Sequence, residues 1–275
     1  MFMAFFGKLK KYTKYALTFP QVLIHRLRGV EGSYDELVTF FRYFPFARIN
    51  KDRTVSFSMN GRKVEIYYGD LFPMAAGIFR SGEYDVVPVK GRVVVDIGAA
   101  IGDTAVYFSI KGARRVYGYE LNKRYFDLAQ RNIDLNNFRD RIEIEYCGVA
   151  SRKISSSDVI LGACVPEQDR QGVDGAGFKT LDTIVQEREV EDAVLKLDVD
   201  GFEYEIIRFA SNETLRRFGL IFIEYHFGVQ DLESKLVEAG FLVEKKKIAN
   251  VVIDRHPAEY RNMDIGYILA RKGNY

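Results

Sequence analysis

Apolar and polar positions along this chain change their period near residue 90. Beyond that point, short apolar runs alternate with segments of helical period, which is typical of a mostly parallel sheet with helices on both faces. The predicted strands span residues 93–96, 115–119, 142–146, 194–198, 220–225, 241–246 and 265–270, and the predicted helices span 103–110, 123–136, 181–187, 202–210 and 230–239. A non-helical stretch with Pro257 joins the last two strands and favours an antiparallel final pair. The predicted fold class is therefore α/β, with a Rossmann-like seven-stranded sheet.

Residues 1–90 follow other patterns. Helices are predicted over residues 35–44, where Pro45 ends the pattern, and over 70–80. Between them, residues 54–58 and 63–68 flank Asn60-Gly61, a strong signal for a two-residue hairpin. We expect a basic, aromatic helical extension over 1–50, a β-hairpin and helix cap over 51–90, and the main domain over 91–275.

The first strand of the main domain runs into a glycine turn. Its candidate ligand-binding residues are Asp96, Gly98, Ala99, Ala100, Gly102, Asp103 and Thr104. Small residues let the backbone approach a ligand, and the helix that follows directs its free N–H groups at it. A dinucleotide site needs G-x-G-x-x-G, whereas the spacing here is D-x-G-x-x-x-G. This spacing resembles the turn of S-adenosylmethionine (SAM) methyltransferases; the alternative is an ordinary turn with incidental glycines.

The ends of the second and third strands extend this predicted cofactor site. Glu120 ends the second strand, where a carboxylate can accept hydrogen bonds from both hydroxyls of a ribose. Leu121 and Asn122 follow it directly. Gly148 and Val149 lie in a small-residue turn after the third strand, which we expect to flank an adenine.

The fourth and fifth strands end in clustered polar side chains: Lys196, Asp198, Asp200 and Glu203 at the fourth, and Glu224 and His226 at the fifth. Unpaired buried carboxylates are costly, so packing alone explains such a cluster poorly. Structural alternatives stay open for single members. Glu203 could be a first-turn acid favoured by the helix dipole, Glu224 could pair with Lys196, and His226 could be a surface or core histidine.

Four segments together resemble the FkbM-type methyltransferases: VVDIGAAIGD at 94–103, Glu120, TLDTIV at 180–185 and LKLDVDGFEYEII at 195–207. The last segment is the most specific, and it departs from the family pattern at Asp200, where the family usually has Glu. The resemblance covers about residues 93–225. It implies SAM-dependent O-methylation of a hydroxyl on a sugar, a glycolipid or polysaccharide, or a polyketide-like small molecule.

A hydroxyl is a poor nucleophile, so a general base should assist its methylation. Asp198 and His226 are the predicted bases, Glu224 could orient the imidazole, and Lys196 completes the catalytic set. Asp198 is also predicted to contact the cofactor. We expect no metal, although Asp198, Asp200 and Glu224 offer the hard oxygen ligands that suit magnesium.

Composition and charge restrict the alternatives. The chain has 275 residues, 47% of them hydrophobic, and a net charge of +2, which gives no strong nucleic-acid signal. Cys147 and Cys164 have no spacing for a zinc site or a disulfide framework, so we expect a reducing, cytoplasmic location. An RNA methyltransferase and a non-catalytic SAM-binding or membrane-associated protein remain the alternative classes. No N-P-P-Y-type tetrapeptide follows the fourth strand, and the oligomeric state stays open.

Residues 1–30 carry six cations and no acid, interleaved with large apolar side chains. Such a helix could rest on the inner face of an anionic membrane, or pack on the domain with its lysines in water. The segment contains neither a run of the ~18 apolar residues that a span needs nor the pattern of a secretory signal. Residues 161–177, rich in glycine, are predicted to form a flexible loop that is either a lid or an insertion.

Overall fold

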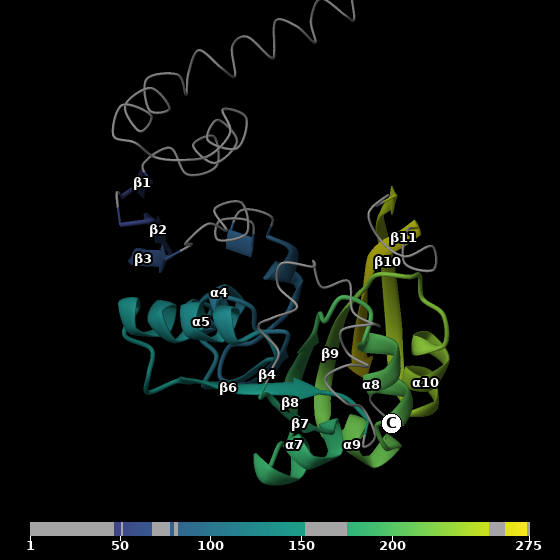
Figure 1. Ribbon diagram of the computed structural model, residues 1–275. Helices are drawn as coiled ribbons and strands as arrows, with labels where there is room; N and C mark the ends of the chain where they lie inside the picture. Colours follow the sequence, from purple (N-terminus) through teal and green to yellow (C-terminus); the bar gives the residue numbers. More distant parts are fainter. Residues whose placement is uncertain are drawn as a thin grey trace, which may run out of the picture.

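A computed structural model of the protein describes residues 47–50, 52–67, 78–79, 82–151, 175–252 and 262–273. Its centre is an eight-stranded sheet with the order β10-β11-β9-β8-β4-β5-β6-β7 (Figure 1). The strands are β4 (Val93–Ile97), β5 (Arg115–Glu120), β6 (Ile142–Val149), β7 (Gly177–Lys179), β8 (Ala193–Leu197), β9 (Phe218–Tyr225), β10 (Phe241–Val252) and β11 (Asn262–Lys272).

The strand directions confirm the predicted α/β fold class. Strands β4 to β9 of this sheet are parallel, and β11 runs antiparallel between β9 and β10. The predicted antiparallel final pair is therefore confirmed, although β10 and β11 run longer than expected. The eighth strand, β7, was not predicted. The strand order reverses direction between β4 and β8, which is where an open α/β sheet leaves a crevice for a ligand.

Helices cover both faces of the sheet (Figure 1). They are α4 (Asp103–Ile110), α5 (Lys123–Leu135), α7 (Leu181–Glu187), α8 (Glu203–Phe209), α9 (Asn212–Arg216) and α10 (Leu232–Glu238), with a short 3-10 helix, η1 (Glu83–Val86). Side chains at alternate positions of the strands belong to two hydrophobic cores, one on each face of the sheet. Val94 and Val194 pack towards α4 and α5, whereas Val95 and Leu195 pack towards α7 to α10. The five-residue α9 was not predicted.

The predicted hairpin is confirmed as β2 (Thr54–Met59) and β3 (Arg62–Tyr67), and the short β1 (Arg48–Ile49) pairs with β2. Asn60 and Gly61 both have positive φ, as the tight turn requires. Asn132 of α5 accepts from the backbone N–H of Tyr67 and donates to its carbonyl oxygen. Apolar hairpin residues such as Val55 also belong to the core between the sheet, α4 and α5. The hairpin thus shares its hydrophobic core with the main domain.

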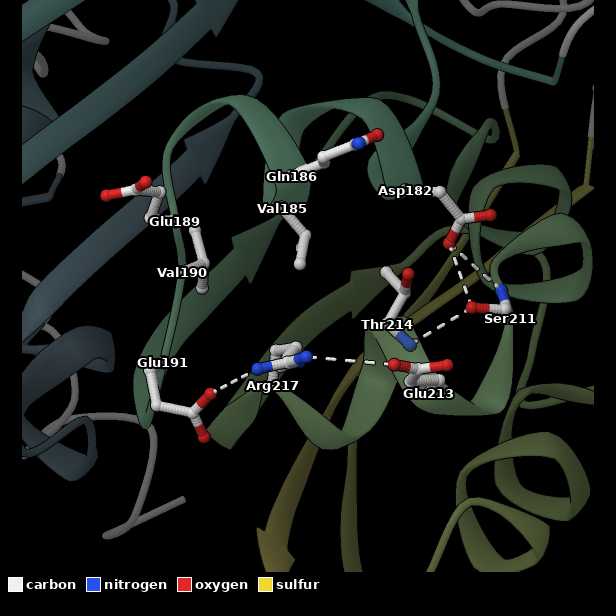
Figure 2. A pocket seen from close by; sticks show the side chains of 10 residues that line it. All are labelled: Asp182, Val185, Gln186, Glu189, Val190, Glu191, Ser211, Glu213, Thr214 and Arg217. Atoms are coloured by element: carbon white, nitrogen blue, oxygen red, sulfur yellow. Dashed lines mark hydrogen bonds and ion pairs between the residues drawn. The ribbon is translucent and has the colours of Figure 1, made fainter.

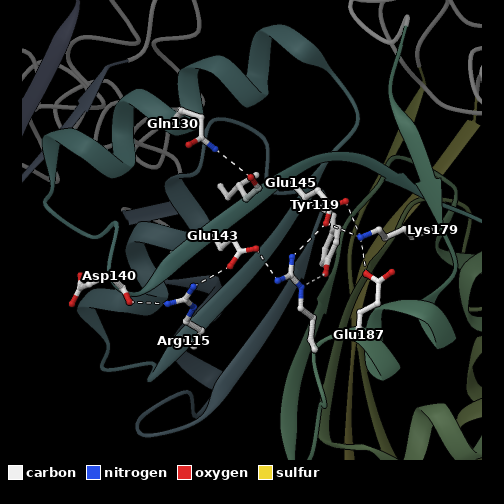
Figure 3. Close-up of polar contacts among 10 residues, drawn as sticks. Arg115, Tyr119, Gln130, Asp140, Glu143, Glu145, Lys179 and Glu187 are labelled. Atoms are coloured by element: carbon white, nitrogen blue, oxygen red, sulfur yellow. Dashed lines mark hydrogen bonds and ion pairs between the residues drawn. The ribbon is translucent and has the colours of Figure 1, made fainter.

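Charged side chains attach β7 to the outer strands (Figure 3). Lys179 of β7 pairs with Glu145 of β6 at 2.8 Å and with Glu187 of α7 at 2.7 Å. Arg188, just after α7, pairs with Glu143 at 2.7 Å. Lys179 thus links β7 to β6 and α7, although partly exposed pairs of this kind each contribute little to stability.

Several predicted segments lie outside the described residues: the helix over 35–44, nearly all of the helix over 70–80, the basic segment 1–30, and residues 161–174 of the predicted loop. The loop prediction extended to residue 177, where β7 begins. Among the described residues, no helix has the length and apolar character that crossing a membrane requires.

Candidate active site

The glycine turn between β4 and α4 lies directly against the end of β8. Gly98 has a φ of 79°, a conformation that disfavours side chains. A Cβ atom at this position would lie 1.8 Å from the carbonyl oxygen of Asp198. Only glycine therefore allows the two backbones to approach this closely, and their contact lies in the crevice where the strand order reverses.

A buried ion pair between β4 and β8 contacts the backbone of this turn. Asp96 and Lys196 are register partners on β4 and β8, and the Lys196 Nζ lies 3.2 Å from an Asp96 oxygen. The same Nζ donates to the carbonyl oxygen of Gly98 at 2.7 Å and lies 3.7 Å from Asp198. Burial alone would lower the pKa of Lys196, but attraction to Asp96 and Asp198 outweighs it and raises this pKa. Lys196 is therefore a cation that positions the turn.

Glu120 lies where the prediction placed it, at the end of β5 beside the turn. One carboxylate oxygen accepts from the N–H of Ala100 at 2.8 Å, and the other from the N–H of Asn122 at 2.7 Å. Burial raises the pKa of Glu120 to about 7 despite these hydrogen bonds. The side chain of Asn122 caps α5 instead, accepting from the N–H groups of Arg124 and Tyr125. Asn122 thus serves the site through its backbone.

Asp103 presents an unsatisfied carboxylate oxygen at the start of α4. The side chain is fully buried, and its Oδ1 accepts from the N–H of Thr104. Its Oδ2 has no hydrogen-bond partner among the described residues. Burial raises the pKa of Asp103 to about 7. The hydroxyl of Thr104 is used within the turn, because it donates to Asp96 at 2.5 Å.

The third-strand prediction needs a correction. Gly148 and Val149 lie within β6 and not in a turn after it, because β7 pairs with them and prolongs the strand. A Cβ at Gly148 would lie 2.5 Å from the ring of Phe178 and 3.0 Å from Leu121. Phe178 of β7 thus covers Gly148 beside Leu121, a neighbour that sequence reasoning missed.

Glu203 opens α8 and is completely buried. Its two oxygens accept from the N–H groups of Val199 and Gly201, both at 2.9 Å. The oxygen that binds Val199 also lies 3.0 Å from Nδ1 of His226. Glu203, for which this role was not predicted, therefore holds the imidazole, because the first turn of α8 folds its carboxylate back towards the end of β9.

His226 lies among carboxylates on more than one side. Its Nε2 lies 3.8 Å from Asp198 and 3.5 Å from Asp200, opposite the Glu203 contact. Burial alone would lower the pKa of His226, but the hydrogen bond and charge of Glu203, with the charges of Asp198 and Asp200, raise it to about 10. Side-chain atoms of Asp198, Glu224 and His226 all lie within 4.8 Å of one another. The structure thus joins the predicted catalytic residues of both strands.

Asp200 stands where the FkbM-type pattern usually has Glu, and its backbone conformation suits aspartate. Its φ is 50°, in the left-handed region. Aspartate adopts this region more readily than most residues with side chains. Its side chain is 59% exposed, so it lies at the rim of the cluster, whereas Glu203 lies at its base.

A surface cleft elsewhere in the molecule does not belong to this site (Figure 2). It lies between α7 and α9, and Glu191, which precedes β8, lines it together with Arg217. That position is the amino-terminal end of β8, whereas Asp198 follows its carboxyl end. Arg217 pairs with Glu191 at 2.6 Å and Asp182 accepts from Ser211, so these charged groups are already engaged.

The strand order, the glycine turn after β4 and the acid that ends β5 together define a class I methyltransferase with a Rossmann-like sheet. Residues 96–243, just over half of the chain, match the family model described as the methyltransferase FkbM domain. The chain belongs to the FkbM methyltransferase family.

Other similarities cover a short part of the chain or the fold alone. Ribosomal protein L11 methyltransferase of Streptococcus pyogenes is 32% identical over 71 residues, 26% of this chain. The match spans only 22% of that relative's length. Among solved structures, TrmK of M. capricolum with S-adenosylhomocysteine (SAH) has a TM-score of 0.46 at 14% identity, covering 72% of this chain and 69% of that one. The ribosomal protein L11 methylase of Lactobacillus delbrueckii subsp. bulgaricus has a TM-score of 0.40 at 17% identity, covering 69% and 74%.

Proposed function

We propose that this methyltransferase uses SAM, bound across the crevice between β4 and β8. The residues present fit this cofactor. Each oxygen of Glu120 accepts one backbone N–H and keeps a lone pair for a ribose hydroxyl, and the Oδ2 of Asp103, which has no partner among the described residues, suits the cationic amino group of a methionine moiety. Leu121, Gly148 and Phe178 offer a small, apolar boundary for an adenine. When bound, SAM supplies a methyl group attached to a positively charged sulfur.

The acceptor that we propose is a hydroxyl group of a sugar, a glycan, a glycolipid or a polyketide-like small molecule. The observation that carries this proposal is the carboxylate cluster around His226, since a hydroxyl must lose its proton as it is methylated. We assign the proton acceptor to Asp198, because its side chain is 30% exposed whereas that of His226 is 6% exposed. The O–H bond breaks towards this carboxylate while the O–CH₃ bond forms and the bond from carbon to sulfur breaks, which leaves SAH.

Each chain residue then has a distinct task. Lys196 fixes the glycine turn and Asp198 through its ammonium group, and Glu203 positions His226. Holding the acceptor in line with the methyl group supplies a large part of the rate enhancement in such displacements. The acidic character of the cluster disfavours a polyanion, because nucleic-acid binding relies on cations that contact phosphates.

The decisive experiment is a transfer assay with SAM labelled in its methyl group. Glycan, lipid and tRNA fractions are incubated with the wild-type chain and with Asp198→Asn. We expect label in the glycan or lipid fraction, and its loss in the variant. Label in tRNA would favour the RNA alternative. SAH binding with no label in any fraction would favour a non-catalytic protein.

We further propose that residues 1–30 assist access to a lipid-linked acceptor by resting on an anionic membrane. The support is the set of six cations without an acid, interleaved with aromatic residues. Each cation near such a surface contributes about 1 kcal/mol to binding.

A further inference from the structure

We propose that Asp198, Glu224 and His226 form a binding site for a divalent cation at the carboxyl ends of β8 and β9. Each residue offers one ligand atom, and the three atoms lie within 4.8 Å of one another. Opposite ligands of Mg²⁺ are separated by about 4.2 Å, twice the usual bond length. Adjacent ligands are about 3.0 Å apart, so side-chain rotations that bring the three atoms closer together would close the site around a cation.

The environment of His226 points to a ligand independently of the acids. The residue is 5% exposed, and its Nδ1 is bound to Glu203 at 3.0 Å. Its Nε2 makes no hydrogen bond within the described part of the chain and lies 3.5 Å from Asp200 and 3.8 Å from Asp198, so a cation bound here would take the place of a proton on this nitrogen. A histidine that binds a metal commonly holds its other nitrogen on a carboxylate, which fixes the ring orientation. Glu203 provides this second contact.

The balance of charge also favours a dication. The carboxylates of Asp198, Asp200, Glu203 and Glu224 gather around one imidazole. Lys196 lies 3.7 Å from Asp198, but it also compensates Asp96 at 3.2 Å. Glu203 is fully buried and Asp198 is 30% exposed, and a carboxylate wholly or partly removed from water is stabilised by a nearby positive charge. A divalent cation at the three ligand atoms would add such a charge.

The donor set differs from the one considered from sequence. Asp200 is 59% exposed and lies 3.5 Å from Nε2 of His226, and His226 takes its place as the third donor. Two carboxylate oxygens and one imidazole nitrogen suit Mg²⁺, Mn²⁺ or Zn²⁺. Three protein ligands leave the remaining coordination positions to water or to oxygens of a ligand.

One consequence rests on the proposed function. A cation that binds the acceptor hydroxyl would lower its pKa and hold its oxygen in place. Asp198 can bind through one oxygen and keep the other for the proton. The cation site itself does not depend on the identity of the acceptor.

The test is a Mn²⁺ titration of the full chain after treatment with a chelator, in which free Mn²⁺ is measured by electron paramagnetic resonance. We expect one Mn²⁺ per wild-type chain. Asp198→Asn, Glu224→Gln and His226→Ala should each weaken binding at least about tenfold, because even changes beyond the ligand shell have effects of this size. Asp140→Asn and Glu213→Gln remove exposed acids far from the site and should bind as the wild type does.

Two outcomes would overturn the proposal: a wild-type chain that binds Mn²⁺ no better than the ligand variants, or control variants that lose as much affinity as the ligand variants. Circular dichroism identifies any variant that fails to fold, and Asp198→Asn, at a position whose side chain is 30% exposed, then carries the test. SAH titration of the same samples distinguishes failure of the cation proposal from failure of the proposed function. SAH binding without Mn²⁺ binding refutes the cation site and leaves the proposed methyl transfer standing.

Discussion

Replacement of Gly98 by alanine tests how the site is assembled. The added Cβ would lie 1.8 Å from the carbonyl oxygen of Asp198, and φ is 79° at this position. A left-handed backbone costs an alanine about 1–2 kcal/mol. Overpacking typically costs a further 1–3 kcal/mol. Gly98→Ala should therefore lower the free energy of unfolding by about 2–5 kcal/mol and displace the turn from the end of β8.

Gly91 provides a matched control. Its φ is 76°, but a Cβ there would meet no atom within 4 Å. Gly91→Ala should show only the backbone strain, about 1–2 kcal/mol, and should bind SAH normally. Urea unfolding and calorimetric titration with SAH measure both quantities. Equal losses of stability in the two variants, or unchanged SAH affinity in Gly98→Ala, would refute the close contact as the reason for glycine.

Four further outcomes are expected. Glu120→Gln should weaken SAH binding by about 1.5–3 kcal/mol in calorimetry, the usual range for a charged hydrogen-bond partner, and an unchanged affinity would contradict the ribose contact. Because burial raises the pKa of Glu120 from 4.5 to about 7, the folded chain holds this proton more tightly than the unfolded chain. The contribution of Glu120 to the free energy of unfolding should thus fall as the pH rises from 4.5 through about 7, while the affinity for SAH rises. In urea titrations across this pH range, Glu120→Gln should lose less stability than the wild type. Glu203→Ala leaves two backbone N–H groups without an acceptor and should cost about 2–5 kcal/mol of stability, whereas Glu203→Gln should cost less; equal losses would argue against these hydrogen bonds. Exchanging the lysines at positions 8, 10, 11 and 14 for glutamine in the full chain should reduce salt-sensitive co-sedimentation with anionic liposomes, and equal partitioning would favour a helix packed on the domain.

The fold was largely predictable because buried parallel strands and amphipathic helices leave strong periodic patterns. The glycine turn and the position of Glu120 beside it were also predictable, because the carboxyl ends of parallel strands converge at one edge of the sheet. β7 was missed because three residues, Gly177–Lys179, carry too little pattern, and their pairing with β6 is decided by tertiary contacts. The missed strand also concealed Phe178.

The role of Glu203 illustrates a different limit. Its position in the first turn of α8 equally suits a helix-capping acid, and it does accept two backbone N–H groups near that turn. Its contact with His226 joins the start of α8 to the residue after β9, 23 positions further along the chain. Local sequence cannot reveal such a contact. The contact between Glu203 and His226 is visible only in the three-dimensional arrangement.

The edge strand β10 carries features that oppose aggregation through strand pairing. Within the described sheet it pairs only with β11, so its other edge offers unpaired backbone groups to any extended chain. Lys245, Lys246 and Lys247 lie exposed along it, and the pairing with β11 is irregular between Lys247 and Ala249. Lysines and bulges on an edge strand oppose the addition of further strands. The exposed Leu242 and Ile248 therefore lie on an edge that is protected against sheet-to-sheet aggregation.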